Sequence, residues 1–152
     1  AKAFASAQRI PLVSVGTLEV EAEPYLGAGI SVCAVIEAGR GRVYAALYDD
    51  PASIDNQIVQ RVVTYDELVA MVHGRRILFC GEGLEAVSST LQDKQRGLAL
   101  LASVSPPTRR PNVLAQLGHQ RLEVGDTDDP HTLQPLYMHG SQFEVAERAR
   151  RL

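Results

Sequence analysis

The chain has 152 residues, a length that suggests one domain or one lobe of a larger protein. Hydrophobic residues make up 45% and charged residues 22%, as in a globular protein that buries a core without disulfides or metals. The net charge of -3 argues against a general nucleic-acid binder with a strongly basic surface. No apolar run approaches the roughly 20 residues that span a bilayer, so we expect no membrane segment.

The first thirty residues predict a helix, a strand and a second helix. Residues 2–8 have apolar side chains at helical spacing, but no residue that could cap the first turn precedes them. We therefore expect the chain to be a piece of a longer protein. Residues 10–15 form a short apolar run that predicts a strand, and Thr17 opens a helical stretch that Pro24 ends or bends.

The middle of the chain predicts three strands. Residues 30–37 are almost continuously apolar, which is typical of a strand buried on both faces. A turn at Gly39-Arg40-Gly41 connects this run to the alternating residues 42–49, so the two should form a hairpin. Residues 57–63 are rich in β-branched side chains and predict the third strand.

Helices and strands alternate after that point. Thr64 and Glu67 have the spacing of a capping box at the start of a helix that ends at Gly74. Pro111 suits the first position of a later helix. In chain order, the further expected elements are a strand at 76–80, a helix at 84–92, a strand at 98–104 and the helix from 111 to about 124. Periodicity alone leaves helix open for 98–104. This order predicts an α/β fold, with a mixed sheet and flanking helices.

The best candidate for a ligand site is the turn at Gly81-Glu82-Gly83. It lies between a strand and a helix, where helix amides can bind an anion. A lone Gly-x-Gly lacks the third glycine of a dinucleotide site and the lysine of a P-loop, so a plain tight turn is the competing interpretation. Glu37 is the best-placed single carboxylate, although a general acid needs a partner and the sequence names none.

Metal-ligating and reactive residues give no recognisable pattern. No pair of histidines has two-ligand spacing on one helix, so we expect no metal and no cofactor. Asp126, Asp128 and Asp129 lack the other features of a calcium loop and read as a solvated loop. Cys33 and Cys80 lie in apolar runs and read as small buried hydrophobes, which fits a reducing, cytoplasmic setting.

Several segments in order resemble the TsaB family, also called YeaZ. The resemblance rests on the segments AKAFASAQRIPLVSVGTLEVEA at 1–22, VCAVIEAGRGRVYAALYD at 32–49, RILFCGEG at 76–83 and LQPLYMHG at 133–140. The resemblance implies an RNase-H-like lobe of the actin/hexokinase-like ATPase fold. It implies a connecting segment at 1–28, the C-terminal lobe at 29–140 and a tail at 141–152, with the N-terminal lobe absent.

The family implies a partner protein and not a catalyst. Its members are scaffolds or regulators that pair with TsaD, and with the ATPase TsaE, in making threonylcarbamoyladenosine beside the anticodon of tRNA. The tRNA contact would be indirect, and a homodimer is a further expectation. Glu37-Ala38-Gly39 stands where the family has Asp-Ala-Arg, and Met138-His139 where it has Leu-Arg. We therefore carry over no catalytic residue.

Two alternatives stay open, and one further prediction concerns the chain itself. An older family label suggests a glycoprotease-like metallopeptidase or a nucleotide hydrolase, whose site would lie in the absent N-terminal part. Arg109-Arg110 and the basic C-terminus could instead bind tRNA directly, although stacking aromatics are not interleaved with them. Finally, a first helix without its covering lobe should expose Phe4 and lead to self-association.

Overall fold

Five strands form one mixed sheet in the computed structural model, which describes residues 1–49, 59–103 and 109–135. The strands lie in the order β3-β2-β1-β4-β5. The pairs β1–β2 and β2–β3 are antiparallel, whereas β4 runs parallel to both β1 and β5. The strands are β1 (Ser31–Gly39), β2 (Arg42–Tyr48), β3 (Val59–Thr64), β4 (Ile77–Cys80) and β5 (Ala99–Leu101).

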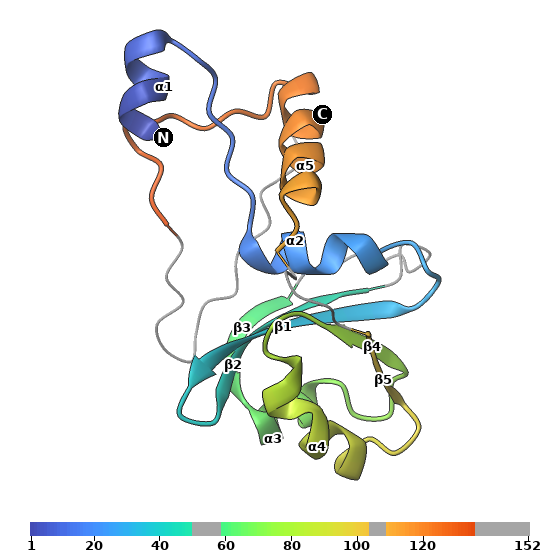
Figure 1. The fold of residues 1–152 in the computed structure, drawn as a ribbon. Coiled ribbons are helices and arrows are strands. Elements are labelled where there is room, and N and C mark those ends of the chain that lie inside the picture. The colour runs from blue at the N-terminus through green and yellow to red at the C-terminus, as the bar shows by residue number, and fades with distance from the viewer. Residues whose placement is uncertain (50–58, 104–108, 136–152) are drawn as a thin grey trace.

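Helices cover both faces of this sheet (Figure 1). One face carries α3 and α4, and the other carries α2 with a short 3-10 turn after it. The first and last helices, α1 and α5, lie beyond α2 and away from the sheet. The helical segments are α1 (Lys2–Gln8), α2 (Thr17–Ala22), the 3-10 turn (Glu23–Tyr25), α3 (Tyr65–Met71), α4 (Leu84–Lys94) and α5 (Pro111–Glu123).

The central strand β1 explains why the sheet needs cover on both sides. Successive side chains of a strand point to opposite faces. Cys33 and Val35 pack with the α3–α4 side of the core, while Val32, Ala34 and Ile36 pack with the α2 side. The predicted burial of this strand on both faces is confirmed, and the expected mixed sheet with flanking helices is the fold observed.

Local signals in the sequence place most helix ends correctly. The Thr64 hydroxyl accepts a hydrogen bond from the Glu67 amide at 3.2 Å, and the Glu67 carboxylate accepts one from the Thr64 amide at 2.7 Å. The capping box is therefore confirmed. Pro111 is the first residue of α5, as predicted, and Pro24 lies in the 3-10 turn that follows α2.

The strand predicted at 10–15 is wrong. Of this segment only Leu12 forms a bridge, with Asp128, and its carbonyl accepts a hydrogen bond from the Asp128 amide at 2.7 Å. The segment runs from α1 back to α2 and has no strand of the sheet beside it (Figure 1). An apolar run without a neighbouring strand has no ladder to join.

Two further predictions differ in extent or lie outside the described residues. The apolar run at 98–104 is a strand, but β5 comprises only Ala99–Leu101. The tail at 136–152, with Met138, His139 and the terminal arginines, lies outside the described residues, as do positions 57 and 58 of the third predicted strand. Within the described residues, no helix has the length and apolarity to cross a bilayer.

Candidate functional site

The glycine turn between β4 and α4 packs directly on the backbone of β1. Gly81 has a φ of 102°, and a Cβ there would lie 2.4 Å from the Val35 carbonyl oxygen. A Cβ on Gly83 would lie 2.8 Å from the Glu37 amide nitrogen. Both positions therefore need glycine because another strand passes within contact distance of the turn.

The amides of this turn already have partners in the chain. The Gly83 N–H donates to the Val35 carbonyl at 3.0 Å, and the Leu84 N–H donates to the Gly81 carbonyl at 3.1 Å. The structure thus brings Gly81, Gly83 and Glu37 together, but it does so through the backbone. The Glu37 side chain itself is exposed. This geometry gives the turn a packing role, and a ligand at this point stays a prediction from the sequence.

A buried carboxylate that no sequence pattern predicted lies close to the same turn. Glu21 on α2 is only 2% exposed. The guanidinium of Arg109 forms an ion pair with Glu82, and its Nε lies 4.0 Å from a Glu21 carboxylate oxygen. Glu21 lies three residues after Leu18 and one before Ala22, both buried, so helical spacing could have placed it on the covered face.

A second arginine attaches α5 to α2. Arg121 donates to both carboxylate oxygens of Glu19, each at 2.7 Å, and also to the Ser14 carbonyl. Between the two arginines, Val113 and Leu117 of α5 pack against Val20 of α2. Arg109 and Arg121 therefore hold the ends of one small apolar contact, and Arg109 is engaged within the chain.

The acidic loop after α5 is partly a structural anchor. Asp128 accepts hydrogen bonds from the Ser14 amide at 2.6 Å and from the Ser14 hydroxyl at 2.7 Å. The expectation of a purely solvated loop is wrong for this residue. Asp129 accepts a hydrogen bond from the His131 amide at 2.8 Å, which shapes the following turn.

Both cysteines are buried, as predicted. Burial raises the pKa of the Cys80 thiol to about 12, with a further contribution from the Glu21 charge, and it raises the pKa of the Cys33 thiol as well. A thiol that stays protonated is a poor nucleophile. The nearby Tyr48 hydroxyl is buried without a hydrogen-bond partner among the described residues, and burial raises its pKa too.

The histidines within the described residues do not converge on one site. His119 lies 3.4 Å from Glu123 one turn later on α5, and His131 lies 3.5 Å from the Ser6 hydroxyl. Over residues 1–49, 59–103 and 109–135, no three His, Cys, Asp or Glu side chains are grouped as a metal would require. His139 lies outside the described residues.

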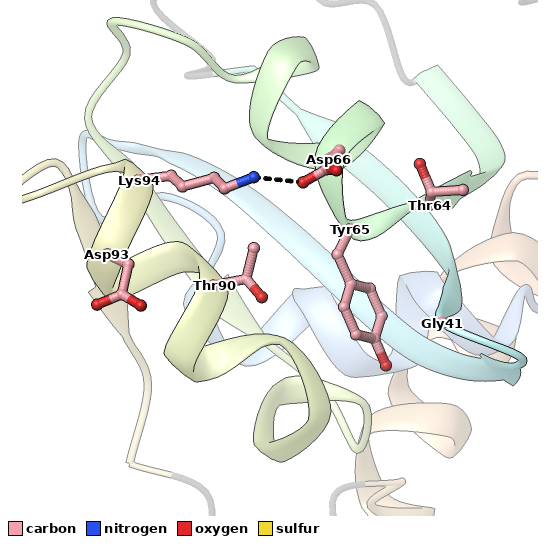
Figure 2. A pocket seen from close by; sticks show the side chains of 7 residues that line it. All are labelled: Gly41, Thr64, Tyr65, Asp66, Thr90, Asp93 and Lys94. Atoms are coloured by element: carbon pink, nitrogen blue, oxygen red, sulfur yellow. Dashed lines mark hydrogen bonds and ion pairs between the residues drawn. The ribbon is translucent and has the colours of Figure 1, made fainter.

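A polar hollow of about 320 Å³ lies between α3, α4 and the β1–β2 turn (Figure 2). Lys94 of α4 forms a 2.5 Å ion pair with Asp66 of α3, and Tyr65 extends toward Gly41. The lining residues are Gly41, Thr64, Tyr65, Asp66, Thr90, Asp93 and Lys94. Because the single lining cation is paired and a second carboxylate is present, the hollow is unsuited to a phosphate.

Exposed apolar side chains on two helices are the more informative feature. They are all the large hydrophobic side chains that are exposed in the described part of the chain, and we refer to them together as the α1–α5 surface. Its members are Phe4, Ile10, Leu114, Leu122 and Val124, with Phe4 68% and Val124 78% exposed. They belong to α1, α5 and the residues that follow each helix. The predicted exposure of Phe4 is confirmed. Exposed apolar side chains mark a contact with other protein where they lie side by side.

Comparison with known proteins gives a likeness in structure. No family model matches the chain, and no curated protein matches it. Solved structures do match it, and two of them are from Pseudomonas aeruginosa. One is an uncharacterized protein with similarity to peptidase YeaZ, with 20% identity and a TM-score of 0.63, over 91% of this chain and 63% of that one. The other is YeaZ, with 21% identity and a TM-score of 0.61, over 90% of this chain and 62% of that one.

The likeness establishes the fold. The mixed sheet with its flanking helices is that of the YeaZ structures, within the actin-like ATPase fold. The chain spans less than two thirds of the length of either solved structure.

Proposed function

We propose that this chain is the C-terminal lobe of a TsaB-type protein, a partner of TsaD in the threonylcarbamoyladenosine modification of tRNA. Two observations support the proposal together. The ordered sequence segments resemble that family, and the fold is that of YeaZ structures over about nine tenths of the chain. In this role the protein acts by binding other proteins, with TsaE as a further partner, and tRNA is contacted only indirectly.

The observation that carries the proposal in the structure is the α1–α5 surface. Its apolar residues lie on the segments that extend from the sheet, away from the core that α3 and α4 close (Figure 1). A lobe that folds around its own sheet and leaves apolar helices uncovered is suited to joining a second lobe. We propose that residues 1–28 connect the two lobes and that α1 packs against the other one.

A genetic test addresses the pathway. Deletion of the whole reading frame that contains this sequence should lower threonylcarbamoyladenosine in tRNA, measured by mass spectrometry of digested nucleosides. Re-expression of the complete frame should restore the modification. Unchanged modification in the deletion strain would contradict the proposed function.

A binding test addresses the partner. The protein from the complete reading frame should capture TsaD of the same organism in a pull-down, whereas an unrelated protein of similar size and charge should not. Titration of the same protein with zinc and with ATP tests the alternative hypothesis of a metallopeptidase or nucleotide hydrolase. Tight binding of either, together with hydrolysis of a glycoprotein or of ATP, would favour an enzyme.

A further inference from the structure

The loop that leads into β1 differs from the glycine turn before α4. Gly27 and Gly29 have φ values of 84° and 70°, and a Cβ on either residue would meet nothing within 4 Å. Packing therefore gives no reason for glycine here, in contrast to Gly81 and Gly83. What the two positions require is the left-handed backbone itself. The loop is exposed and joins the 3-10 turn to β1 at the right of Figure 1.

The amides of this loop are available to a ligand. Gly27, Ala28 and Gly29 are exposed, and none of their N–H groups donates to an acceptor within the described residues. The φ of Ala28 is negative, whereas those of its two neighbours are positive. Alternation in the sign of φ is the pattern by which successive N–H groups turn to one side and form a concave anion site. The loop thus presents three adjacent donors.

Two arginines stand beside the loop, at the start of β4. In the parallel pairing of β1 with β4, Ser31 lies opposite Ile77, so the residues just before these two are also neighbours. Those before Ile77 are Arg75 and Arg76. The Nη2 group of Arg75 donates to the Ser31 hydroxyl at 3.2 Å and forms an ion pair with Asp49. A guanidinium has five N–H donors, so this pairing leaves others for a ligand.

The charge balance at this point is positive. Asp49 neutralises Arg75, while Arg76 is exposed and has no ion-pair partner within the described part of the chain. Both arginines follow the C-terminal end of α3, where a cation is favourable, and this accounts for a basic residue. It does not account for a glycine loop with free amides at the same place. Amide donors combined with a guanidinium are suited to a phosphate group.

We infer that the loop at 27–29 and Arg76, supported by Arg75, bind the terminal phosphate of a small phosphorylated molecule. Such a phosphate carries nearly two negative charges and has three acceptor oxygens, which suits three amides and a guanidinium. A phosphate inside a nucleic-acid strand carries a single charge and suits the site less well. The inference goes beyond the proposed function and does not depend on it.

An NMR titration of the nitrogen-15-labelled 152-residue chain tests the site. Glycerol 3-phosphate should shift the amide signals of Gly27, Ala28 and Gly29 until saturation, with a Kd on the order of 1 mM for a ligand of few atoms. Potassium chloride at equal ionic strength should not shift them. Inorganic phosphate identifies the source: equal affinity means that the phosphate alone is bound, and weaker affinity means that the rest of the molecule contributes. Both results uphold the inference.

A pair of variants tests the role of the free charge. Arg76→Gln keeps an exposed polar side chain, so we expect it to fold and to raise the Kd for glycerol 3-phosphate at least about ten-fold. Arg42→Gln is the matched control, because Arg42 is also an exposed arginine but lies at the other end of β1, opposite Gly39. It should change the Kd less than about two-fold. The spectrum of each variant shows whether it is folded.

Three outcomes would overturn the inference. Amide signals of the loop that stay unchanged at about twenty times the expected Kd would show that no phosphate binds there. Equal weakening by Arg76→Gln and Arg42→Gln would indicate an adventitious ion only. A five-nucleotide RNA without terminal phosphates that shifts the same amides with higher affinity would assign the loop to a nucleic-acid strand. None of these results changes the outcome of the TsaD experiments, so the two proposals fail separately.

Discussion

Two buried ionisable side chains, Glu21 and Cys80, lie close together at α2. Glu21 on that helix is 2% exposed, and the Arg109 guanidinium lies within ion-pair distance of it. The Cys80 thiol lies 3.5 Å from the Glu21 carbonyl oxygen, which it can reach as a weak donor. A buried carboxylate without a facing cation is costly, so Arg109 has a structural reason to be where it is. Because Arg109 is paired with Glu21 and Glu82, it is less available to bind RNA.

The capping carboxylate of α3 gives stability a defined pH dependence. Hydrogen bonds from the Thr64 amide and hydroxyl lower the pKa of Glu67 below its usual value of 4.5. A lowered pKa in the folded state means that the stabilisation is present above the unfolded value and is lost as the pH falls through the folded value. Glu67→Ala should therefore lower Tm most near neutral pH, and its difference from the native chain should shrink below about pH 4.5.

Thermal melts at pH 7, 5, 4 and 3 measure this difference. Glu85→Ala is the matched control, because Glu85 stands in the first turn of α4, a helix that has no side-chain cap. Its effect on Tm should be smaller at pH 7. An effect of Glu67→Ala that stays constant down to pH 3 would show that the capping box is not formed in solution.

At the scale of elements, the close approach of α4 to β1 depends on the two glycines of the turn before it. Gly81 and Gly83 allow the turn to lie against the β1 backbone between Val35 and Glu37. This contact places Leu84, Val87 and Leu91 of α4 over the sheet, where they join the larger of the two main core clusters. The turn is therefore part of how the helix is packed.

Two glycine substitutions separate this packing effect from helix propensity. Gly83→Ala brings a Cβ to 2.8 Å from the Glu37 nitrogen, in a backbone without positive φ, so we expect a loss of about 2–3 kcal/mol in the free energy of unfolding. Gly118→Ala places a methyl group in open space within a helix, so we expect a gain of up to about 1 kcal/mol. Urea denaturation at low protein concentration measures both, and equal effects would contradict the described packing.

The whole molecule consists of a well-covered sheet and a thinner extension made of α1, α5 and the segments that join them. The sheet has extensive cores on both faces, whereas α5 meets α2 through three buried apolar residues and the flanking arginines. On α1 only Ala5 is buried. Lys2 of α1 donates to the Leu133 carbonyl at 2.6 Å, so α1 contacts the segment that follows α5. The extension therefore depends on few contacts.

Removal of the Arg121 contacts between α5 and α2 should loosen the extension and leave the sheet intact. Arg121→Ala removes the two bonds to Glu19 and the bond to Ser14, which we expect to cost about 2 kcal/mol locally, as for other charge-assisted hydrogen bonds. Hydrogen exchange should become faster in residues 111–123 and stay unchanged in β1. Arg96→Ala removes an exposed arginine as the control, and uniform acceleration across the chain would contradict this division of the molecule.

Local patterns along the chain were enough to predict most helices and strands and the mixed sheet. Apolar runs, alternation and turn residues predicted β1, the hairpin to β2, the capping box at Thr64 and the proline start of α5, because these features depend on neighbours along the chain. The burial of β1 on both faces also followed from composition, since an almost continuously apolar strand needs cover on each side.

Which distant residues meet became visible only in the folded chain. The segment at 10–15 has strand composition but no strand beside it, and Asp128 of a polar loop becomes an anchor for Ser14. Likewise Glu21 meets Arg109, and Gly83 meets the β1 backbone, across separations that no local pattern encodes. Pairing and burial depend on which residues lie nearby in space. The spacing of residues along the sequence reveals such neighbours only within one helix, strand or turn.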